Sequence, residues 1–362
     1  MNAATRREFL HAAAMGAAAG AASAASAAEK RDTMKKKTPV IDMHSHMEVP
    51  EAVALLPEKP AAASSPTSAA SAAHQERLFQ MLKDQLQNPE KKIEDMDKAG
   101  IDVSIISLAP PQMFYNLEGA LAVDVVRKQN ETIAGVAQKY PARFLAMATV
   151  PLQSPDAAAQ ELDRAVRELK MKGVQVASNV RGQYLGEPKF LPFFETAAKL
   201  DIPVFIHPTN VAGTDRMKFF YFSNLVGNPL DTTITAGHLI FSGIFDRLPN
   251  LKIVLAHAGG MLPYNIDRWG HGWEVRPEFR EILKKSPVEY IRNFYYDTIT
   301  HGPATLKFLL SRVGVDRIVM GTDYPYDMGD MDPLKSIRAA KLSRQDTEKI
   351  VNTNVRGLYK IA

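Results

Sequence analysis

The feature that most constrains the fold is a regular alternation of short β-rich segments with longer segments of helical periodicity. The β-rich segments are short apolar runs, the pattern of strands that are buried on both faces of a parallel sheet. They cover residues 40–46, 101–108, 143–150, 173–177, 202–206, 251–256, 294–298 and 317–320. Helical periodicity covers residues 76–87, 89–100, 120–140, 155–171, 188–200, 231–248, 303–313 and 344–359. This alternation predicts an α/β fold, a closed (β/α)8 TIM barrel, with a doubly wound open sheet as the alternative.

The segments outside this alternation predict the domain organisation. Residues 1–28 contain Arg6-Arg7, a weakly hydrophobic Ala/Gly run and Ala-x-Ala cleavage options, and they resemble a twin-arginine (Tat) export signal. We expect residues 29–38 to be a charged linker and residues 39–362 to be the barrel domain. Residues 47–75 are rich in Pro, Ala and Ser, which predicts a small looped insertion after the first strand. The expected location is therefore the periplasm, with the Tat machinery as a partner.

Composition excludes several classes of function. The 362-residue chain has no cysteine, so a disulfide or a thiolate metal site is impossible, and any metal must be held by His, Asp or Glu. The formal net charge of +4 is small for this length and gives no argument for nucleic-acid binding. The apolar run in the leader is too short and too weak to predict a membrane span.

Polar residues that can bind metal stand directly after several of the predicted strands. His44 and His46 end the first strand, His207 and His257 follow the fifth and sixth, and Asp323 follows the eighth. The carboxyl ends of all strands meet on one face of a parallel barrel, so we expect these five residues to converge there. His44 and His46 are spaced i, i+2 and point to the same side of their strand. Each residue alone could be a turn residue or a helix cap, but together they predict a metal site.

The remaining histidines are weaker candidates. His238 falls within a predicted helix and is expected to be structural. His74 borders the low-complexity tract, and His11 lies in the leader. His271 and His301 follow predicted strands and could reach the site.

The combination of motifs resembles the amidohydrolase superfamily. In particular it is similar to the amidohydrolase-related decarboxylase family typified by aminocarboxymuconate semialdehyde decarboxylase. The resemblance covers nearly the whole chain after about residue 39. The stretches that carry it are residues 41–46, 150–153, 202–208, 256–260, 267–272, 294–297 and 321–326.

The resemblance implies a mononuclear metal site, usually with zinc. His44, His46, His207 and Asp323 would be the protein ligands, and water would complete the shell. His257 would stay off the metal and act, with Asp323, as the acid/base that moves protons. Another divalent transition metal would fit the same nitrogen and oxygen ligands.

The resemblance also implies a substrate class and an assembly. Arg268 resembles an arginine that reaches the substrate carboxylate of a neighbouring subunit, which implies a homodimer. Arg181 and Asn210 are further candidates for contact with a small-molecule carboxylate substrate. The leading hypothesis is a metal-dependent, non-oxidative decarboxylase of an unsaturated or aromatic carboxylic acid. The alternatives are a metal-dependent hydrolase of a lactone, ester or amide and, less favoured, a non-catalytic periplasmic metal- or solute-binding protein.

The export signal makes the first testable prediction. Replacing Arg6 and Arg7 with Lys should block export, because the twin arginine is what the Tat receptor reads. Mature protein from the periplasm should begin near Ala28 or Glu29, as measured by N-terminal sequencing. An intact N-terminus on protein purified from the cytoplasm of the native host would contradict this prediction.

Overall fold

The computed structural model describes residues 38–57 and 69–361. The described residues from Pro39 onward form one compact unit, whereas the expected export signal and almost all of the expected linker lie outside the described residues. Within the described ranges, no helix combines the length and the apolar character that crossing a bilayer requires.

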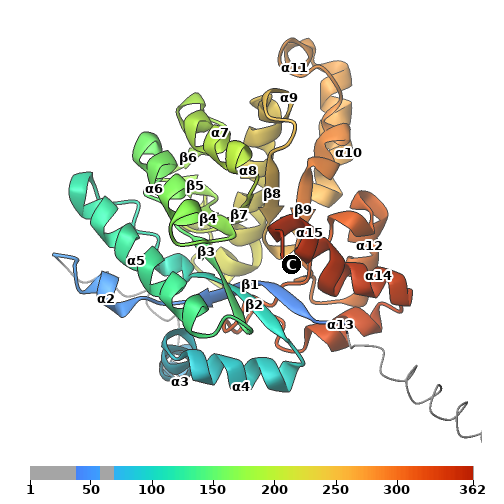
Figure 1. Cartoon of the computed structure of the whole chain (residues 1–362). Coiled ribbons are helices and arrows are strands. Elements are labelled where there is room, and N and C mark those ends of the chain that lie inside the picture. The colour runs from blue at the N-terminus through green and yellow to red at the C-terminus, as the bar shows by residue number, and fades with distance from the viewer. Residues whose placement is uncertain (1–37, 58–68, 362) are drawn as a thin grey trace, which may run out of the picture. The chain divides into compact units, whose positions relative to one another are not determined.

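A curled parallel sheet forms the centre of the unit (Figure 1). Its seven strands pair in the order β1-β2-β3-β4-β7-β8-β9, and every neighbouring pair is parallel. Their bounds are β1 Ile41–Met47, β2 Val103–Leu108, β3 Phe144–Ala148, β4 Gly173–Ala177, β7 Pro203–His207, β8 Lys252–Leu255 and β9 Phe294–Tyr296. Each of these strands begins and ends within two residues of its predicted bounds.

Residues 318–324 close the sheet into a barrel. On one side Ile318 bridges Tyr296 of β9, and on the other Tyr324 bridges Ser45 of β1. The backbone amide of Met43 also donates to the carbonyl of Met320 at 2.9 Å. Because β1 and β9 are joined through this segment, the barrel is closed, which confirms the (β/α)8 prediction against an open sheet.

The prediction of a continuous eighth strand over residues 317–320 is wrong in detail. A 3₁₀ turn occupies Val315–Arg317, and the residues after it make isolated bridges instead of a continuous ladder. The side chain of Asp42 accepts the backbone amide of Thr322 at 3.1 Å, and Asp323 has a left-handed φ of 59°. The Thr322 amide is shared between Asp42 Oδ1 and the carbonyl of His44, which lies 3.3 Å away, and the chain turns at Asp323 where a strand would continue.

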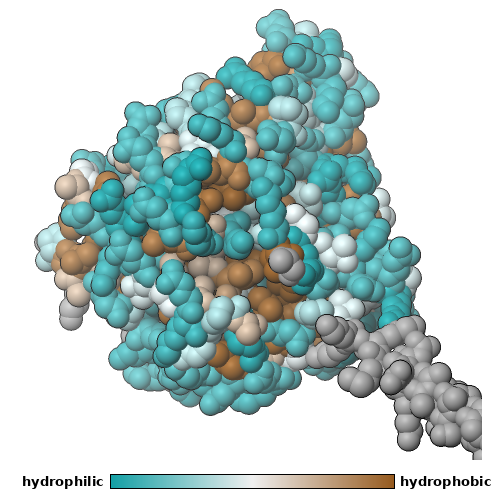
Figure 2. Space-filling view, in the orientation of Figure 1, coloured by the Kyte–Doolittle hydropathy of each residue, from teal (hydrophilic) through white to brown (hydrophobic). Residues whose placement is uncertain are grey.

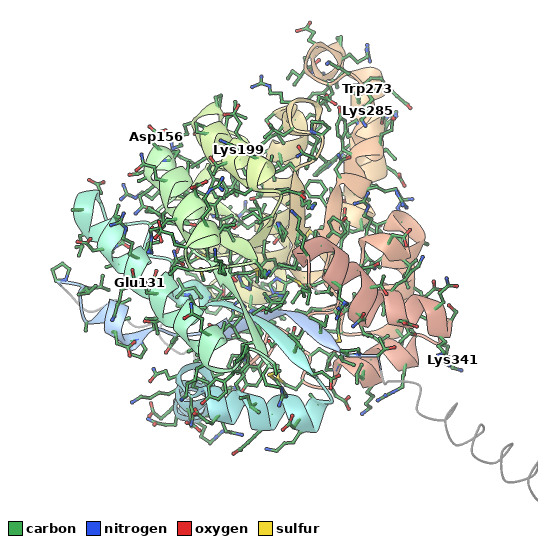
Figure 3. The ribbon with its side chains drawn as sticks, viewed as in Figure 1. Glu131, Asp156, Lys199, Trp273, Lys285 and Lys341 are labelled. Carbon is green, nitrogen blue, oxygen red and sulfur yellow. The ribbon has the colours of Figure 1, made fainter. Side chains whose placement is uncertain are left out.

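Helices form the outer layer around the strands (Figure 1). Those before β7 are α2 Pro50–Val53, α3 Ala69–Gln87, α4 Pro89–Ala99, α5 Gly119–Lys139, α6 Pro155–Arg167 and α7 Leu191–Leu200. Those after it are α8 Asn228–Phe241, α9 Ile244–Arg247, α10 Leu262–Val275, α11 Pro277–Ile282, α12 Pro303–Val313, α13 Pro333–Ala339, α14 Arg344–Glu348 and α15 Asn354–Tyr359. Charged side chains such as Asp156 on α6 and Lys199 on α7 lie on the outside of this layer (Figure 3), and the face seen in Figure 2 is largely hydrophilic.

Local sequence explains well-bounded helices such as α4. The side chain of Asn88 accepts the amides of Glu90 and Lys91, which satisfies two of the donors that a helix N-terminus leaves free. Pro89 occupies the first turn, where its missing N–H costs nothing. Gly100 ends the helix with a left-handed φ of 73°.

Several helices differ from the sequence predictions. Helix α3 begins at Ala69, inside the tract that was expected to be a loop, and alanine is the strongest helix former. The single helix expected over residues 231–248 is two helices, because Gly243 adopts a left-handed φ of 70° between α8 and α9. Helices α10, α11 and α13 and a small hairpin, Asn179–Val180 with Gln183–Tyr184, were not predicted. Glycines at 270 and 272 weaken the helical signal of α10.

Two apolar clusters fix the barrel. A larger cluster fills the space between the strands and the outer helices. A smaller cluster includes Ile41, Met43, Phe205 and Val254 of the strands together with Tyr359 of α15. The strand ends that carry the polar residues lie beyond this second cluster, where His44 contacts the ring of Phe205 with centroids 4.6 Å apart. The apolar filling therefore forms the floor of the polar site.

Candidate metal centre

Strand β1 places His44 and His46 in direct proximity. Both side chains are fully buried, and their Nε2 atoms lie 3.1 Å apart. The pairing of β1 with β2 shifts register between Asp42 and Ser45, so the strand is irregular at this point. Two imidazoles on one side of a strand end are the start of a metal site.

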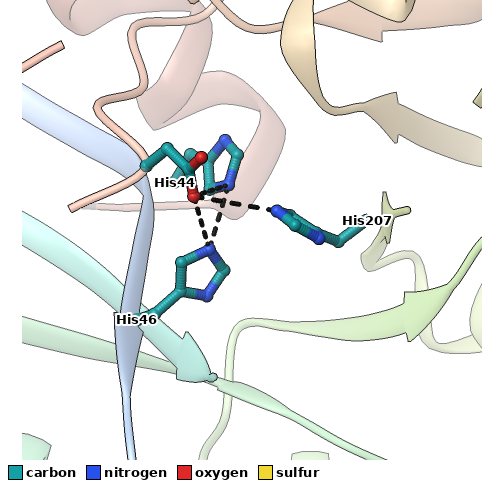
Figure 4. A group of neighbouring side chains, drawn as sticks. His44, His46 and His207 are labelled. Carbon is teal, nitrogen blue, oxygen red and sulfur yellow. Dashed lines mark hydrogen bonds and ion pairs between the residues drawn. The ribbon is translucent and has the colours of Figure 1, made fainter. Parts of the chain in front are cut away.

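His207 and Asp323 complete the cluster from distant parts of the chain. The Oδ1 atom of Asp323 lies 3.2 Å from His44 Nε2, 3.1 Å from His46 Nε2 and 3.7 Å from His207 Nε2. One ligand atom from each of the four residues lies within 4.8 Å of all the others. Figure 4 shows the side chains of His46 and His207 pointing toward the centre of the cluster from different strands. The structure thus brings together the four residues that were expected to bind metal.

The donor set fits a divalent ion. His207 Nε2 is buried and has no hydrogen-bond partner among the described residues, although it faces the carboxylate of Asp323. An unpaired buried polar atom is costly, and an ion between these side chains would satisfy it. Three imidazole nitrogens and one carboxylate oxygen are ligands that zinc and related divalent metals accept.

The Nδ1 atoms of His46 and His207 are held by backbone carbonyl groups. His46 Nδ1 lies 3.2 Å from the carbonyl oxygen of Leu108, and His207 Nδ1 lies 3.0 Å from that of Pro208. These contacts fix which nitrogen faces the cluster, because a carbonyl can only accept a hydrogen bond. The Nε2 atoms of both residues therefore face the cluster and are the atoms available to a metal ion.

Asp297 is the buried residue whose role sequence reasoning missed. Its Oδ2 lies 2.8 Å from His44 Nδ1 and accepts the backbone amide of His257 at 2.8 Å. Its Oδ1 accepts the amide of Ala258 at 2.8 Å. One carboxylate therefore orients a metal-site imidazole and the backbone of the candidate acid/base. Its place directly after β9, at the same edge as the other polar residues, was the signal that could have revealed it.

The side chain of Asp42 links β1, which carries His44, to the segment that carries Asp323. Its Oδ1 accepts the backbone amides of His44 at 3.0 Å and Thr322 at 3.1 Å, and its Oδ2 accepts the Thr322 hydroxyl at 2.7 Å. Burial raises the pKa of Asp42 to about 6, although these hydrogen bonds act in the opposite direction. Asp42 therefore fixes β1 against the segment that bears Asp323.

The pKa values of the three histidines in the cluster are shifted in two opposite directions. Burial lowers the pKa of His46 to about 3 and that of His207 to about 4, so both imidazoles are neutral at pH 7. Burial also acts to lower the pKa of His44, but the charges of Asp323 and Asp297 outweigh it and raise this pKa to about 10. Burial acts to raise the pKa of Asp323, yet the neighbouring imidazoles hold it well below its usual value.

His257 lies beside the cluster, on the other oxygen of Asp323. Its Nε2 is 3.3 Å from Asp323 Oδ2, whereas the three other imidazoles face Oδ1. Its Nδ1 is buried without a hydrogen-bond partner among the described residues. His257 adopts a left-handed φ of 54° directly after β8. This position suits a group that exchanges protons beside the metal centre.

The expected substrate-contacting residues lie apart from this cluster within the single chain. Arg268 is exposed on α10, and Asn210 is exposed in the loop after β7. Arg181 donates to the carbonyl of Tyr115 at 2.7 Å and pairs with Glu118 at 2.9 Å. Their contact with substrate remains a prediction.

The weaker histidine candidates lie outside the cluster, whereas one tyrosine that was not predicted lies beside it. His271 and His301 are exposed, and His271 lies 3.7 Å from Glu274 on α10. His238 lies in α8, as predicted, and stacks on Tyr184 with ring centroids 4.8 Å apart. Tyr326 was not singled out, yet its ring lies 5.5 Å from that of His46, and its buried hydroxyl has no partner among the described residues.

The chain is similar in sequence and in structure to known decarboxylases. The sequence family described as Amidohydrolase matches residues 41–361. The chain is 34% identical over 274 residues to 2-amino-3-carboxymuconate-6-semialdehyde decarboxylase of Dictyostelium discoideum, covering 75% of this chain and 76% of that protein. It is 33% identical over 281 residues to gamma-resorcylate decarboxylase of Rhizobium radiobacter, covering 74% of this chain and 85% of that protein. A crystal structure of a dihydroxybenzoic acid decarboxylase from Polaromonas sp. JS666, with bound manganese and the inhibitor 2-nitroresorcinol, matches with a TM-score of 0.77 and 27% identity, covering 90% of this chain and 98% of that one.

The raised pKa of His44 predicts proton release on metal binding. An ion that binds Nε2 of His44 must displace the proton held there below a pH of about 10, whereas His46 and His207 have none to lose at pH 7. We expect about one proton released per ion at pH 7, and an affinity that rises by about tenfold per pH unit. Calorimetric metal titrations in two buffers of different ionisation enthalpy measure the number of protons. Metal binding with no proton release and no pH dependence would contradict this electrostatic description.

Proposed function

This chain belongs to the amidohydrolase family, and on that premise we propose that it is a metal-dependent decarboxylase of an aromatic or unsaturated carboxylic acid. The observation that carries the proposal is the buried cluster of three imidazoles and one carboxylate, with His257 beside it. The relatives named above are decarboxylases and match most of the chain. They support decarboxylation over the hydrolase and over the non-catalytic binding protein that the sequence left open.

The names of the relatives guide the substrate class. One relative is named for a carboxymuconate semialdehyde, and the others for resorcylic and dihydroxybenzoic acids. These compounds share a carboxyl group on an unsaturated or aromatic carbon framework. We carry this class, and no single compound, to the present chain.

A divalent ion would be held by His44, His46, His207 and Asp323. When bound, it supplies a positive charge that polarises substrate oxygens. Zinc is the ion that we propose from the nitrogen-rich ligand set. Manganese, which the Polaromonas structure contains, is the alternative that the same ligands admit.

The chain's own residues manage the proton that decarboxylation requires. As the bond to the carboxylate carbon breaks and CO2 leaves, its electron pair stays on the substrate carbon, which must take up one proton. His257 is suited to deliver this proton, because it contacts Asp323 Oδ2 and its second ring nitrogen has no partner within residues 38–57 and 69–361. Asp297 holds the backbone of His257 in place through its amide. Tyr326 offers a hydroxyl near His46 that could orient the substrate.

The proposal is tested by product analysis. Metal-loaded protein is incubated with aromatic carboxylic acids, starting from gamma-resorcylate, and in parallel with lactones and esters. We expect CO2 release with appearance of the decarboxylated product from a member of the first group. Acid release from lactones or esters, without CO2 from any carboxylic acid, would favour the hydrolase instead.

Substitution of His257 tests its assigned role. His257→Asn should keep the fold and the metal, and should lower kcat by about 10²–10⁴-fold, the usual contribution of a general acid/base. His74→Asn is the matched control, because His74 is exposed on α3. Metal content and kcat are measured for both variants. Loss of metal in His257→Asn would make His257 a ligand, and near-normal turnover would remove it from the mechanism.

We also propose that the protein is a homodimer. Helices α10 and α11 extend away from the strands at the upper right of Figure 1 and carry the exposed Arg268. Large apolar side chains on them are exposed, with Tyr264 at 79%, Val275 at 57% and Ile282 at 55%. A subunit interface would remove these apolar side chains from water. A second copy would cover them and would bring Arg268 to the neighbouring site.

Arg268 provides the test of this shared site. Arg268→Ala should raise KM by about 10- to 100-fold with little change in Tm, as expected from losing a charge-assisted hydrogen bond of about 1.5–3 kcal/mol. Arg276→Ala is the control, because Arg276 is exposed near the same helices and pairs with Glu278 at 2.7 Å. Sedimentation should give a dimer. A fully active monomer would refute the shared site.

The periplasm is the proposed location. The support is the twin arginine and the Ala-rich run within residues 1–28, and the Arg6 and Arg7 variants described above test it. A cysteine-free chain suits that oxidising compartment.

A further inference from the structure

A cavity lies outside the barrel wall, between β1 and the helices α3 and α4. Its volume is about 770 Å³, within the range of small-molecule sites. Asp42 and Ser45 of β1 form part of its wall, together with Met81 of α3, Met96 of α4 and Tyr324. In Figure 1 α3 and α4 lie side by side below β1. No residue of the proposed metal-ligand set lines this cavity.

The cavity runs from the strands to the protein surface. Asp42 and Ser45 are each 1% exposed, whereas Met81 is 51% and Met331 is 43% exposed. Asp42 stands between Ile41 and Met43, whose side chains belong to the smaller apolar cluster beneath the metal site, so its side chain lies on the opposite side of β1 and the inner end of the cavity is behind the metal-binding side. This cavity is therefore distinct from the substrate side of the barrel.

Two buried polar atoms on the wall lack a partner. The hydroxyl of Ser45 and the Oε1 atom of Gln85 have no hydrogen-bond partner among the described residues. The amide nitrogen of Gln85 already donates to Asp95 at 3.1 Å, so its free atom is an acceptor. A ligand that satisfies Gln85 must therefore donate a hydrogen bond, and the Ser45 hydroxyl can accept one as well.

The charges on the wall favour a cation. The lining contains the carboxylates of Asp42, Asp84, Asp95 and Asp332 and the ammonium groups of Lys91 and Lys98.

Both lysines pair with one aspartate, since Lys91 lies 2.6 Å and Lys98 3.2 Å from Asp95 Oδ1. Asp84 and Asp332 take part in no ion pair among the described residues. The ammonium of Lys92 lies 4.2 Å from the centroid of the Tyr324 ring, so four carboxylates face three ammonium groups, and the cavity keeps an excess of one negative charge that a cationic ligand would balance.

The rest of the wall is apolar and adaptable. Met81, Met96 and Met331 line it with Ile101 and the ring of Tyr324. Methionine side chains adapt to ligand shape and contact aromatic groups favourably. We propose that this cavity binds a small organic ammonium with an apolar body, whose charge faces the carboxylates of the wall and whose body contacts the methionines.

Calorimetry with three matched probes tests the charge preference. The metal-loaded enzyme is titrated at pH 8 with 2-phenylethylammonium, 2-phenylethanol and 3-phenylpropanoate, which share a phenyl group and differ in the charge of the polar end. We expect the ammonium to bind at least about tenfold more tightly than the carboxylate, because the wall carries excess negative charge. Carboxylate binding that equals or exceeds ammonium binding and is abolished by Ala99→Trp would overturn the proposal, whereas carboxylate binding that survives Ala99→Trp belongs to the metal centre. The ammonium readout is binding and not turnover, so it does not depend on the proposed decarboxylation.

Two sets of variants locate the binding. Ala99→Trp places an indole across the cavity and should abolish ammonium binding, whereas Ala304→Trp, at an exposed position on α12, should not. Circular dichroism and metal content confirm that both variants fold.

A double variant tests the charge preference with a smaller change in side-chain shape than Ala99→Trp makes. The double variant Asp84→Asn with Asp332→Asn should weaken ammonium binding about fivefold or more and leave phenylethanol binding unchanged, since Asn still caps α13 as Asp332 does. Ammonium binding that survives Ala99→Trp, or that is indifferent to the two charges, would overturn the proposal.

Discussion

The carboxylate of Asp323 is the interaction on which the site depends. Its Oδ1 faces the Nε2 atoms of His44, His46 and His207, and its Oδ2 faces His257. A carboxylate and three imidazoles buried together are costly unless charge and hydrogen bonds are balanced. A divalent ion balances them, which is why the burial of these polar groups indicates a metal centre. One side chain thus links metal binding to the group proposed to carry the proton.

The barrel keeps this arrangement rigid through buried carboxylates behind the ligands. Asp42 joins β1 to the segment of Asp323, and Asp297 joins His44 to the turn of His257. Both His257 and Asp323 have left-handed backbone conformations, with φ of 54° and 59°. Such conformations cost on the order of 1–3 kcal/mol each and persist when the surroundings determine them. The hydrogen bonds of Asp297 and Asp42 to backbone amides of these turns provide that determination.

The sequence predicted what depends on periodicity and on strand ends. The parallel barrel, its first seven strands and the convergence of His44, His46, His207 and Asp323 follow from apolar runs that end in polar residues. The eighth strand was overestimated, because residues 318–324 make only isolated bridges to β9 and β1 and the chain turns at Asp323, which has a left-handed φ of 59°. Helix α10 and the role of Asp297 were missed, since glycines obscure the first and a single aspartate after a strand gives little signal. The cavity behind β1 depends on how α3 and α4 pack, which no local pattern encodes.

The most direct test of the account is a crystal structure of the metal-loaded protein with an anomalous difference map recorded at the absorption edge of the bound metal. The account predicts one strong peak, bound by Nε2 of His44, His46 and His207 and by a carboxylate oxygen of Asp323. His257 should lie near the ion without binding it. A peak bound by His257, or an ion elsewhere with these four side chains free of metal, would contradict the central claim.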